Sequence, residues 1–589
     1  MSQDQSTPRR IPILIGILAL YVILATIYSV TIPLGEAPDE APHFTVIRYI
    51  VEHGRLPSSE EEHEAFQPPL YYLLGVALTF WADYDGYVIK ANADFSLAPG
   101  APKNLLLHDR SEAFPYRGPA LAWHILRFFS VLCGAVTIYA TYQLGRIAFP
   151  RRPAIAWSMA ALNAFIPEFL FMSAVVNNDN LAGAFSALLL WQIARLVRKG
   201  TNPGHVAALG VLWGGGILSK VSVAVTGLPL AGALAYVAWR REGRLGPAAR
   251  RALAWWALAM ATALAVCGWW LVRNQILYGD AIGWEFVLRT NALREGPLTP
   301  AVLLWLVKGL FRSFWLAWIG IEFSAPLYWA LAGLCILAVL GLVRLVLIGQ
   351  KTLGREEKVI LVLMFSQIVG VGASLLKWTA TVLGTDQARL LYPALPAILL
   401  FLVLGLATWL PARREHWLAG GLGTAFLLLA IISPWVYIRP VYAPPERISR
   451  AEMEAMATPA SIRFGDAIEL VGYRLPETVR AGDMAEILLC WVALRPVEQD
   501  LWLTLSLSSD LTAAPFTKDG SPSAGRDTTD WWEPGEIIAA RHFLPVPESA
   551  PAGVYRLEMG IHPFGSWEWL PAGSAQSTHI ELGQIRVHH

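Results

Sequence analysis

The feature of this sequence that most constrains its fold is a series of long apolar runs. The first of them, residues 11–31, carries no charge, and it is long enough to cross the hydrocarbon core of a bilayer, which takes roughly 17–25 apolar residues. Over the whole chain, 55% of the residues are hydrophobic, only 15% are charged and the mean hydropathy is +0.45. A soluble domain does not carry this much apolar surface. We therefore predict a polytopic α-helical membrane protein.

Eleven runs have the length and composition of membrane spans. The stretch 204–240 counts as two of them, because the sequence GGGILSK at 214–220 interrupts it. The first run is longer than the apolar core of a signal peptide, so we expect it to stay in the mature protein as an uncleaved span. The predicted spans are residues 11–32, 119–146, 154–175, 180–197, 204–219, 221–239, 251–272, 326–348, 358–377, 391–410 and 416–438.

The charges of the loops predict the orientation of these spans. Cytoplasmic loops are enriched in Lys and Arg, and placing Arg9 and Arg10 in the cytoplasm puts every second loop there as well. All five of those loops are basic. They contain Arg146, Arg151 and Arg152; Arg195, Arg198 and Lys199; Arg240, Arg241, Arg244, Arg250 and Arg251; Lys351, Arg355 and Lys358; and Arg413 and Arg414.

This orientation requires two apolar segments to lie along the outer surface as interfacial helices. The segments 68–82 and 301–320 are rich in aromatic residues, which suit the headgroup depth. An odd number of spans then leaves the C-terminal region outside. We predict a multi-pass protein of the cell membrane with a cytoplasmic N-terminus. Its extracytoplasmic face would carry a long first loop, residues 33–118, and a C-terminal domain.

The C-terminal region changes character near residue 460. Short runs of alternating hydrophobicity, separated by Pro, Gly and Asp, predict an antiparallel β-sandwich over 460–589. We expect a transmembrane domain at 1–439 and a linker at 440–459. The predicted strands lie within residues 467–475, 483–494, 501–509, 536–546, 553–562 and 579–587.

Two adjacent acids directly follow the first span. Asp39 and Glu40 stand between Pro38 and Pro42 in the sequence APDEAPHF, and proline restricts both its own backbone and that of the preceding residue. Apolar residues recur after them with helical spacing, which predicts an interfacial helix lying on the membrane. The acid pair would thus stand in a fixed place at the start of this helix, where the helix dipole favours negative charge.

This arrangement resembles the GT-C class of polytopic glycosyltransferases, which includes protein O-mannosyltransferase and aminoarabinose transferase-like families. The sequence is most similar to an uncharacterised bacterial subgroup. The motifs that carry the resemblance extend over residues 11–410. They are APDEAPHF (37–44), FQPPLYYLL (66–74), NNDNLAG (177–183), SK (219–220), WWLVRNQILYGDAIG (269–283) and QARLLYPALPA (387–397).

The resemblance implies transfer of a sugar from a polyprenyl-phosphate donor to an acceptor on the outer face. The acceptor is a glycan, a lipid or a protein. Asp39 matches the family's general base, with Glu40 as a supporting acid. A carboxylate can take the proton of an acceptor hydroxyl, and the leaving phosphate needs cations near the membrane boundary. Three residues are our candidates for phosphate binding: Lys220, Arg273 and Arg389.

Five other polar residues are candidates for contact with the substrate. His43, His63, Glu64, Asn178 and Asp179 are candidates for substrate binding, although Asp179 is also expected to cap the fourth span. Asp39 with His63 and Glu64 could hold a divalent metal ion, but no ligand spacing supports such a site. The cofactor requirement therefore stays open.

Two further charges, Arg127 and Glu168, lie within or near spans. An intramembrane charge suggests function by default. An ion pair between neighbouring helices would explain both residues without any functional role.

Two other functions compete with the transferase. The first is a transporter or flippase of lipid-linked glycans. Transporters usually show repeated halves and charges near the midplane, whereas we find no internal repeat here and the polar residues collect on one face. The second is a GT-C scaffold without catalysis, whose sandwich binds surface polysaccharide. The sequence contains no basic stretch interleaved with aromatics, so we expect no nucleic-acid partner.

Overall fold

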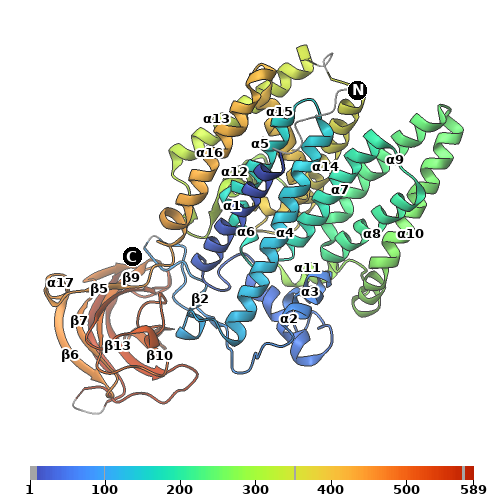
Figure 1. Ribbon diagram of the computed structural model, residues 1–589. Coiled ribbons are helices and arrows are strands. Elements are labelled where there is room, and N and C mark those ends of the chain that lie inside the picture. The colour runs from blue at the N-terminus through green and yellow to red at the C-terminus, as the bar shows by residue number, and fades with distance from the viewer. Residues whose placement is uncertain (1–9, 99, 350–352, 574–576) are drawn as a thin grey trace. The chain divides into compact units, whose positions relative to one another are not determined.

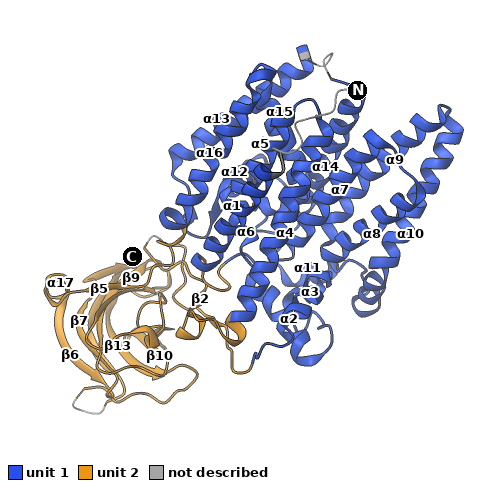
Figure 2. Cartoon of the chain, in the orientation of Figure 1, with its two compact units in different colours: residues 1–31, 37–84, 121–437 blue, residues 32–36, 85–120, 438–589 orange. Residues whose placement is uncertain are grey.

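The computed structural model describes residues 10–98, 100–349, 353–573 and 577–589. The chain divides into two compact units. The helical unit comprises residues 1–31, 37–84 and 121–437 (Figure 2). The sandwich unit comprises residues 32–36, 85–120 and 438–589. The first loop, predicted at 33–118, therefore contributes to both units.

The helical unit is a bundle of long apolar helices (Figure 1). Among the described residues, nine helices are long and apolar enough to cross a membrane, and a bent pair would make a tenth. The helices are α1 (Arg10–Thr31), α2 (Glu40–His53), α3 (Leu70–Thr79), α4 (Gly118–Ala148), α5 (Pro153–Phe165), α6 (Pro167–Ser173), α7 (Asp179–Lys199), α8 (Pro203–Ser219), α9 (Gly227–Glu242), α10 (Leu245–Tyr278), α11 (Trp284–Thr290), α12 (Pro300–Trp315), α13 (Ala325–Arg344), α14 (Arg355–Thr379), α15 (Leu395–Ala407) and α16 (Glu415–Ser433).

The prediction of a polytopic helical membrane protein is confirmed, and two predicted spans differ in detail from the helices found. The run 154–175 is bent by 59° between α5 and α6. The bend lies at Ile166, whose backbone is extended (φ −65°, ψ 120°) because the following Pro167 disfavours the helical conformation before it. The predicted span 204–219 is found as helix α8, which has 17 residues and is shorter than the nine long apolar helices.

Glycines let some of these helices approach closely. A Cβ at Gly210 or Gly214 of α8 would clash with the backbone carbonyls of Ala259 or Ala263 in α10. In the same way, a Cβ at Gly405 of α15 would clash with the Ala338 carbonyl of α13. The glycines at 214–216 therefore lie inside a helix and serve its packing, as small residues do at helix interfaces in membranes.

The basic loops meet at one end of the bundle, which we call the basic-loop end. Glu356 pairs with both Arg198 (2.9 Å) and Arg240 (2.6 Å). Arg152 pairs with Glu415 (2.7 Å), and Arg198 donates to the Ala148 carbonyl (2.7 Å). These contacts join all five predicted cytoplasmic loops, although Arg9 and Lys351 lie outside the described residues. The loops predicted to be outside lie at the opposite end of the spans.

Helix α2 differs from the prediction in what covers its apolar face. We expected this face to lie on the membrane, but Phe44, Ile47 and Ile50 are buried within the protein. Phe44 stacks on Trp123 of α4, with ring centroids 3.9 Å apart, and Ile47 packs against Gly75 of α3. Helix α2 is thereby fixed to the bundle. Helix α3 does expose apolar residues on one face, as an interfacial helix would.

The sandwich unit contains two five-stranded sheets with the orders β11-β10-β13-β14-β8 and β5-β12-β9-β7-β6. Pairing is antiparallel except between β14 and β8. Buried residues from both sheets, including Trp491 and Tyr555, form a common core. The strands are β5 (Glu446–Ile448), β6 (Thr458–Phe464), β7 (Ile468–Arg474), β8 (Thr478–Arg480), β9 (Met484–Ala493), β10 (Leu501–Ser508), β11 (Phe516–Gly520), β12 (Ile537–Pro545), β13 (Gly553–Pro563) and β14 (Ile580–His588).

All six predicted strand regions contain a strand, and the predicted β-rich C-terminal domain is confirmed. The stretch 440–459, predicted to be a linker, is instead largely built into the unit, because it provides β5 and helix α17 (Arg450–Met456). Met453 of α17 is fully buried among residues of β7 and β9, which explains why this short segment is ordered.

Part of the first loop belongs to the sandwich unit. Lys90 pairs with Asp500 (3.2 Å), and Asp94 pairs with Lys518 (2.8 Å). The short strands β1 (Lys90–Ala91) and β2 (Leu106–Leu107) pair with each other. We expected the loop to belong wholly to the membrane domain. Side-chain contacts over more than 400 positions of sequence decide otherwise.

Candidate active site

Asp39 occupies the turn that leads into α2. Its backbone is left-handed (φ 59°, ψ 11°), a conformation that is uncommon for residues other than glycine and least unfavourable for Asp and Asn. Among the described residues, Ala524 is the only other non-glycine with positive φ. The Asp39 carbonyl accepts from the His43 amide (3.1 Å), while the side chain makes no capping bond to α2. The carboxylate therefore stays available for other partners.

Glu40, the next residue, ties this turn to the interior of the helical unit. Its side chain is fully buried, and its carboxylate accepts from Nε (2.7 Å) and Nη2 (2.8 Å) of Arg127. Trp123 Nε1 and the Val176 amide also donate to it, each at 3.0 Å. A carboxylate so enclosed has no exposed surface to offer a substrate. These contacts favour a role in positioning the turn at Asp39, and the predicted supporting role of Glu40 stays a prediction.

The cation that pairs with Asp39 is Arg389, which lies 350 positions later in the sequence. Arg389 lies in the 3-10 turn η6 (Ala388–Ala394) that leads into α15. Its Nη2 donates to Oδ2 of Asp39 (2.6 Å), and its Nη1 donates to Oδ2 of Asp179 (3.2 Å). The Gln387 side chain orients the guanidinium by accepting from Nε (2.8 Å). One arginine is thus shared between two carboxylates.

A second cation completes this cluster. Lys220, at the C-terminal end of α8, donates to Oδ1 of Asp179 (2.5 Å). Asp179 begins α7, but the helix-capping role we predicted for it is wrong. Its carboxylate is turned to Lys220 and Arg389, and Asn178 is the N-cap residue. Four predicted residues from four separate motifs therefore form one chain of ion pairs. We call this group the polar cluster: Asp39, Asp179, Lys220 and Arg389.

Exposure differs within the polar cluster. The Asp39 side chain is 44% exposed, whereas that of Arg389 is 8% exposed. No described residue donates a hydrogen bond to the second carboxylate oxygen of Asp39. Burial opposes ionisation of Asp39, but the charge and the hydrogen bond of Arg389 and the other nearby basic groups, Lys220 among them, together outweigh it and hold the pKa of Asp39 at about 2. Asp39 is thus an ionised carboxylate with one oxygen free to accept a proton or a hydrogen bond.

Glu64 lies beside the cluster in the 3-10 turn η1 (His63–Phe66). Burial, followed by the negative charge of Asp39, raises the pKa of Glu64 to about 7. Its carboxylate accepts from Gln67 Nε2, and the side-chain oxygen Oε1 of Gln67 in turn accepts from Asn178 Nδ2 (2.6 Å). The Asn178 oxygen is buried without a hydrogen-bond partner among the described residues. Gln67 was not predicted, since nothing local distinguishes it within FQPP.

His43 faces the cluster from the first turn of α2. It is buried, and its Nδ1 lies 2.8 Å from the hydroxyl of Tyr72 in α3. Burial, opposed by the charge of Asp39, lowers the pKa of His43 to about 3. The imidazole is therefore neutral at physiological pH and can exchange a hydrogen bond with Tyr72. Tyr72 is a second residue that the sequence analysis missed.

Two predicted residues do not join these ion pairs. Arg273 of α10 donates to the Pro57 carbonyl (2.8 Å) and lies 4.7 Å from the ring centroid of Trp270. The His63 side chain is 48% exposed, with its Nε2 3.9 Å from Glu64. Its ring lies near Phe66 and Phe286. His63 lies in η1 itself. The phosphate contact predicted for Arg273 and the substrate contact predicted for His63 stay predictions.

The pairing suggested for the two intramembrane charges is wrong. Arg127 pairs with Glu40, as described above, while Glu168 Oε2 accepts from the Ala317 amide (3.3 Å). The sequence could not reveal this, because Glu40 and Arg127 lie 87 positions apart.

The residues present do not fit the suggested metal site. Among the described residues, no group of three or more His, Cys, Asp or Glu side chains lies close enough to hold a metal ion. The two carboxylates of the polar cluster already pair with Arg389. We therefore derive no chemistry from a metal ion.

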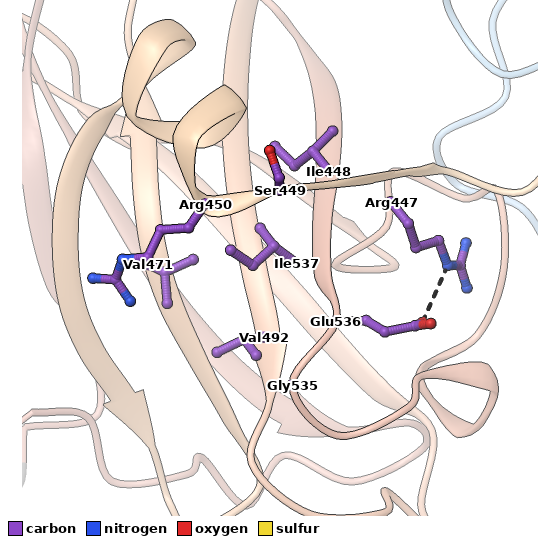
Figure 3. A pocket seen from close by; sticks show the side chains of 9 residues that line it. All are labelled: Arg447, Ile448, Ser449, Arg450, Val471, Val492, Gly535, Glu536 and Ile537. Carbon is purple, nitrogen blue, oxygen red and sulfur yellow. Dashed lines mark ion pairs between the residues drawn. The ribbon is translucent and has the colours of Figure 1, made fainter.

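A cavity of about 420 Å³ lies in the sandwich unit, on the outer side of β5, β7, β9 and β12 (Figure 3). Its floor is aliphatic, and Arg447 at its edge pairs with Asp527 (3.2 Å) and Glu536 (3.6 Å). None of its nine lining residues is aromatic: Arg447, Ile448, Ser449, Arg450, Val471, Val492, Gly535, Glu536 and Ile537. Sugar-binding surfaces commonly use aromatic rings, so this cavity is not assigned to a glycan.

Comparison with known proteins adds to this geometry. Residues 122–271 match the model of the family described as dolichyl-phosphate-mannose-protein mannosyltransferase. The chain resembles the GT-C superfamily of membrane glycosyltransferases, as we predicted. The matched segment includes Asp179 and Lys220 but neither Asp39 nor Arg389. No curated protein sequence matches the chain significantly.

Three solved structures show weaker likeness. ArnT from Cupriavidus metallidurans bound to undecaprenyl phosphate is 14% identical, with a TM-score of 0.41 over 73% of this chain and 74% of its own. The Archaeoglobus fulgidus oligosaccharyltransferase in complex with Zn and sulfate is 13% identical, with a TM-score of 0.35 over 72% and 52%. Arabinosyltransferase EmbB from Mycobacterium smegmatis is 12% identical, with a TM-score of 0.33 over 99% and 66%. These values are too low to transfer any function.

Proposed function

We propose that this protein transfers a sugar from a polyprenyl-phosphate donor to an acceptor hydroxyl at the end of the bundle opposite the basic loops. The observation that carries the proposal is the polar cluster, in which a half-exposed carboxylate and two cations meet at the ends of spans. A lipid-linked donor presents its phosphate at this depth of the membrane. The positive-inside rule puts this end on the extracytoplasmic face.

The proposed reaction is a single displacement. The acceptor oxygen attacks the anomeric carbon while its proton passes to the free oxygen of Asp39. The bond from the anomeric carbon to the phosphate oxygen breaks, and the electron pair leaves with the lipid phosphate. Configuration at the anomeric carbon is inverted. Arg389 and Lys220 stabilise the negative charge that gathers on the phosphate, because charge-assisted hydrogen bonds are strong where water is scarce.

The sharing of Arg389 suggests how the base becomes active. With a pKa of about 2, Asp39 is a weak base as long as Arg389 is bound to it. A donor phosphate competes for the same guanidinium. Its binding removes the Asp39–Arg389 hydrogen bond, which raises the basicity of Asp39 when the substrate is in place. Asp179 keeps Arg389 and Lys220 near the phosphate during this exchange.

The alternatives receive less support. A transporter needs polar groups along a path through the membrane, whereas the polar cluster lies where several spans end. A polysaccharide-binding scaffold would need a sugar site in the sandwich unit, and the cavity found there has an aliphatic floor with its arginine paired. The family description of residues 122–271 also names a transferase that uses a polyprenyl-phosphate sugar.

The proposal is tested with purified protein and a panel of polyprenyl-phosphate sugars. Release of polyprenyl phosphate in the presence of membrane extract as acceptor would be measured for the wild type and for Asp39→Asn. We expect the variant to lose about 100- to 10,000-fold in rate, the usual contribution of a general base. Glu60→Gln is the matched control, since Glu60 is an exposed acid of the same loop, and it should transfer normally.

Undiminished transfer by a folded Asp39→Asn variant would show that Asp39 is not the base. Movement of an intact lipid-linked glycan across proteoliposomes, with no donor consumed, would favour the transporter.

A further inference from the structure

A second cavity lies at the basic-loop end, far along the spans from the polar cluster. It has a volume of about 340 Å³, within the range of small-ligand sites, roughly 300–1,000 Å³. The cavity lies between the first residues of α5 and of α16, two helices that pack along one another (Figure 1). Its lining residues are Arg151, Arg152, Pro153, Ala154, Trp157, Ala412, Glu415, His416 and Ala419.

The charges around this cavity favour an anion. Arg152 is bound to the buried Glu415 at 2.7 Å, so these two lining charges cancel. Arg151 is exposed, and no described acidic side chain pairs with it. Arg413 and Arg414, also exposed, lie in the turn that connects two lining residues. The cavity thus offers an unneutralised arginine with two more arginines beside it.

The backbone adds to this preference. Helices α5 and α16 both begin at the cavity, and neither has a side-chain cap. The positive ends of two helix dipoles therefore converge there, with Glu415 in the first turn of α16 as the acid between them. Trp157 forms one wall and packs on Tyr142, with ring centroids 4.5 Å apart. Arg146 in turn lies over the Tyr142 ring at 5.7 Å.

We propose that this cavity binds the phosphate headgroup of an anionic phospholipid. A lipid is favoured over a soluble phosphate because the cavity lies at the ends of spans, beside residues typical of the membrane interface. Trp417 is 70% exposed next to the lining residue His416, and Trp409 is 42% exposed at the end of α15. Tryptophan is enriched at headgroup depth, and basic pockets between spans bind anionic headgroups. This site is independent of the proposed transferase activity.

The test measures lipid retention by the full-length protein. Wild type would be reconstituted into nanodiscs that contain phosphatidylglycerol and phosphatidylcholine, extracted mildly, and examined by native mass spectrometry. We expect one phosphatidylglycerol to be retained in preference to phosphatidylcholine. Arg151→Gln should weaken retention about five-fold, the effect of one cation near a membrane surface. Arg250→Gln, which changes an exposed arginine near the start of α10, should retain the lipid as the wild type does.

Three results would overturn the proposal. Equal retention of the two lipids by the wild type would show that the cavity does not select anionic headgroups. An equal loss of phosphatidylglycerol in both variants would show a general effect of surface charge. If inorganic phosphate, but not phosphatidylglycerol, protected the wild type against heat and failed to protect Arg151→Gln, the cavity would bind a soluble phosphate instead.

Discussion

The buried pair Glu40–Arg127 offers a direct measure of how the first loop is held. We consider the variants Arg127→Met and Glu40→Gln, alone and together. Both side chains are 0% exposed, so water cannot replace a lost partner. Arg127→Met leaves an uncompensated buried carboxylate, which costs about 3–5 kcal/mol. Glu40→Gln leaves the arginine charge unpaired, at a similar cost.

The double variant removes both charges. Its glutamine can still accept from Trp123 and the Val176 amide, so these two buried donors keep an acceptor. Because the desolvation cost of both ions disappears as well, we expect the double variant to be no less stable than either single variant. The favourable coupling should amount to several kcal/mol in a double-mutant cycle.

The assay is heat-induced loss of the folded, monodisperse protein in detergent, followed by tryptophan fluorescence and gel filtration. Arg48→Met with Glu52→Gln is the matched control, since this pair lies on the same loop helix with side chains 27% and 32% exposed. Its removal should cost no more than about 0.5 kcal/mol. If Arg127→Met melted like the wild type, or if the double variant were as damaged as the two singles added together, the positioning role of Glu40 would be refuted.

Two further predictions concern the chemistry around the polar cluster. The pKa of Glu64 is raised to about 7 in the folded protein, so its contribution to stability is complete below the unfolded pKa near 4.5 and is lost as the pH rises through 7. The free energy of unfolding should therefore decline between pH 4.5 and 7, and Glu64→Gln should remove this decline. An unchanged profile in the variant would place the titration elsewhere. Because Arg389 and Lys220 already pair with the carboxylates of the polar cluster, we expect the rate of sugar transfer to change by no more than about two-fold when EDTA is added. Loss of transfer in EDTA and its recovery with Mg²⁺ or Mn²⁺ would show that a metal site forms with substrate.

Local patterns in the amino-acid sequence were enough to predict several parts of this protein. Apolar runs located the spans, alternation located six strand regions, and loop arginines predicted which loops share an end. These signals are local because a span or a strand must satisfy its backbone hydrogen bonds and its hydrophobic face through residues close in sequence. Asp39 was also found locally, from its place between two prolines directly after a span.

The pairing of charges, in contrast, depends on how distant segments pack in the folded chain. Asp39 bonds to Arg389 over 350 positions, and Glu40 pairs with Arg127 over 87 positions. The same holds for the part of the first loop that packs on the sandwich strands. Such pairings depend on how helices and strands are placed, and a charge on its own gives no sign of its partner. Packing therefore sorts the candidate acids and cations into the polar cluster and the buried pair Glu40–Arg127.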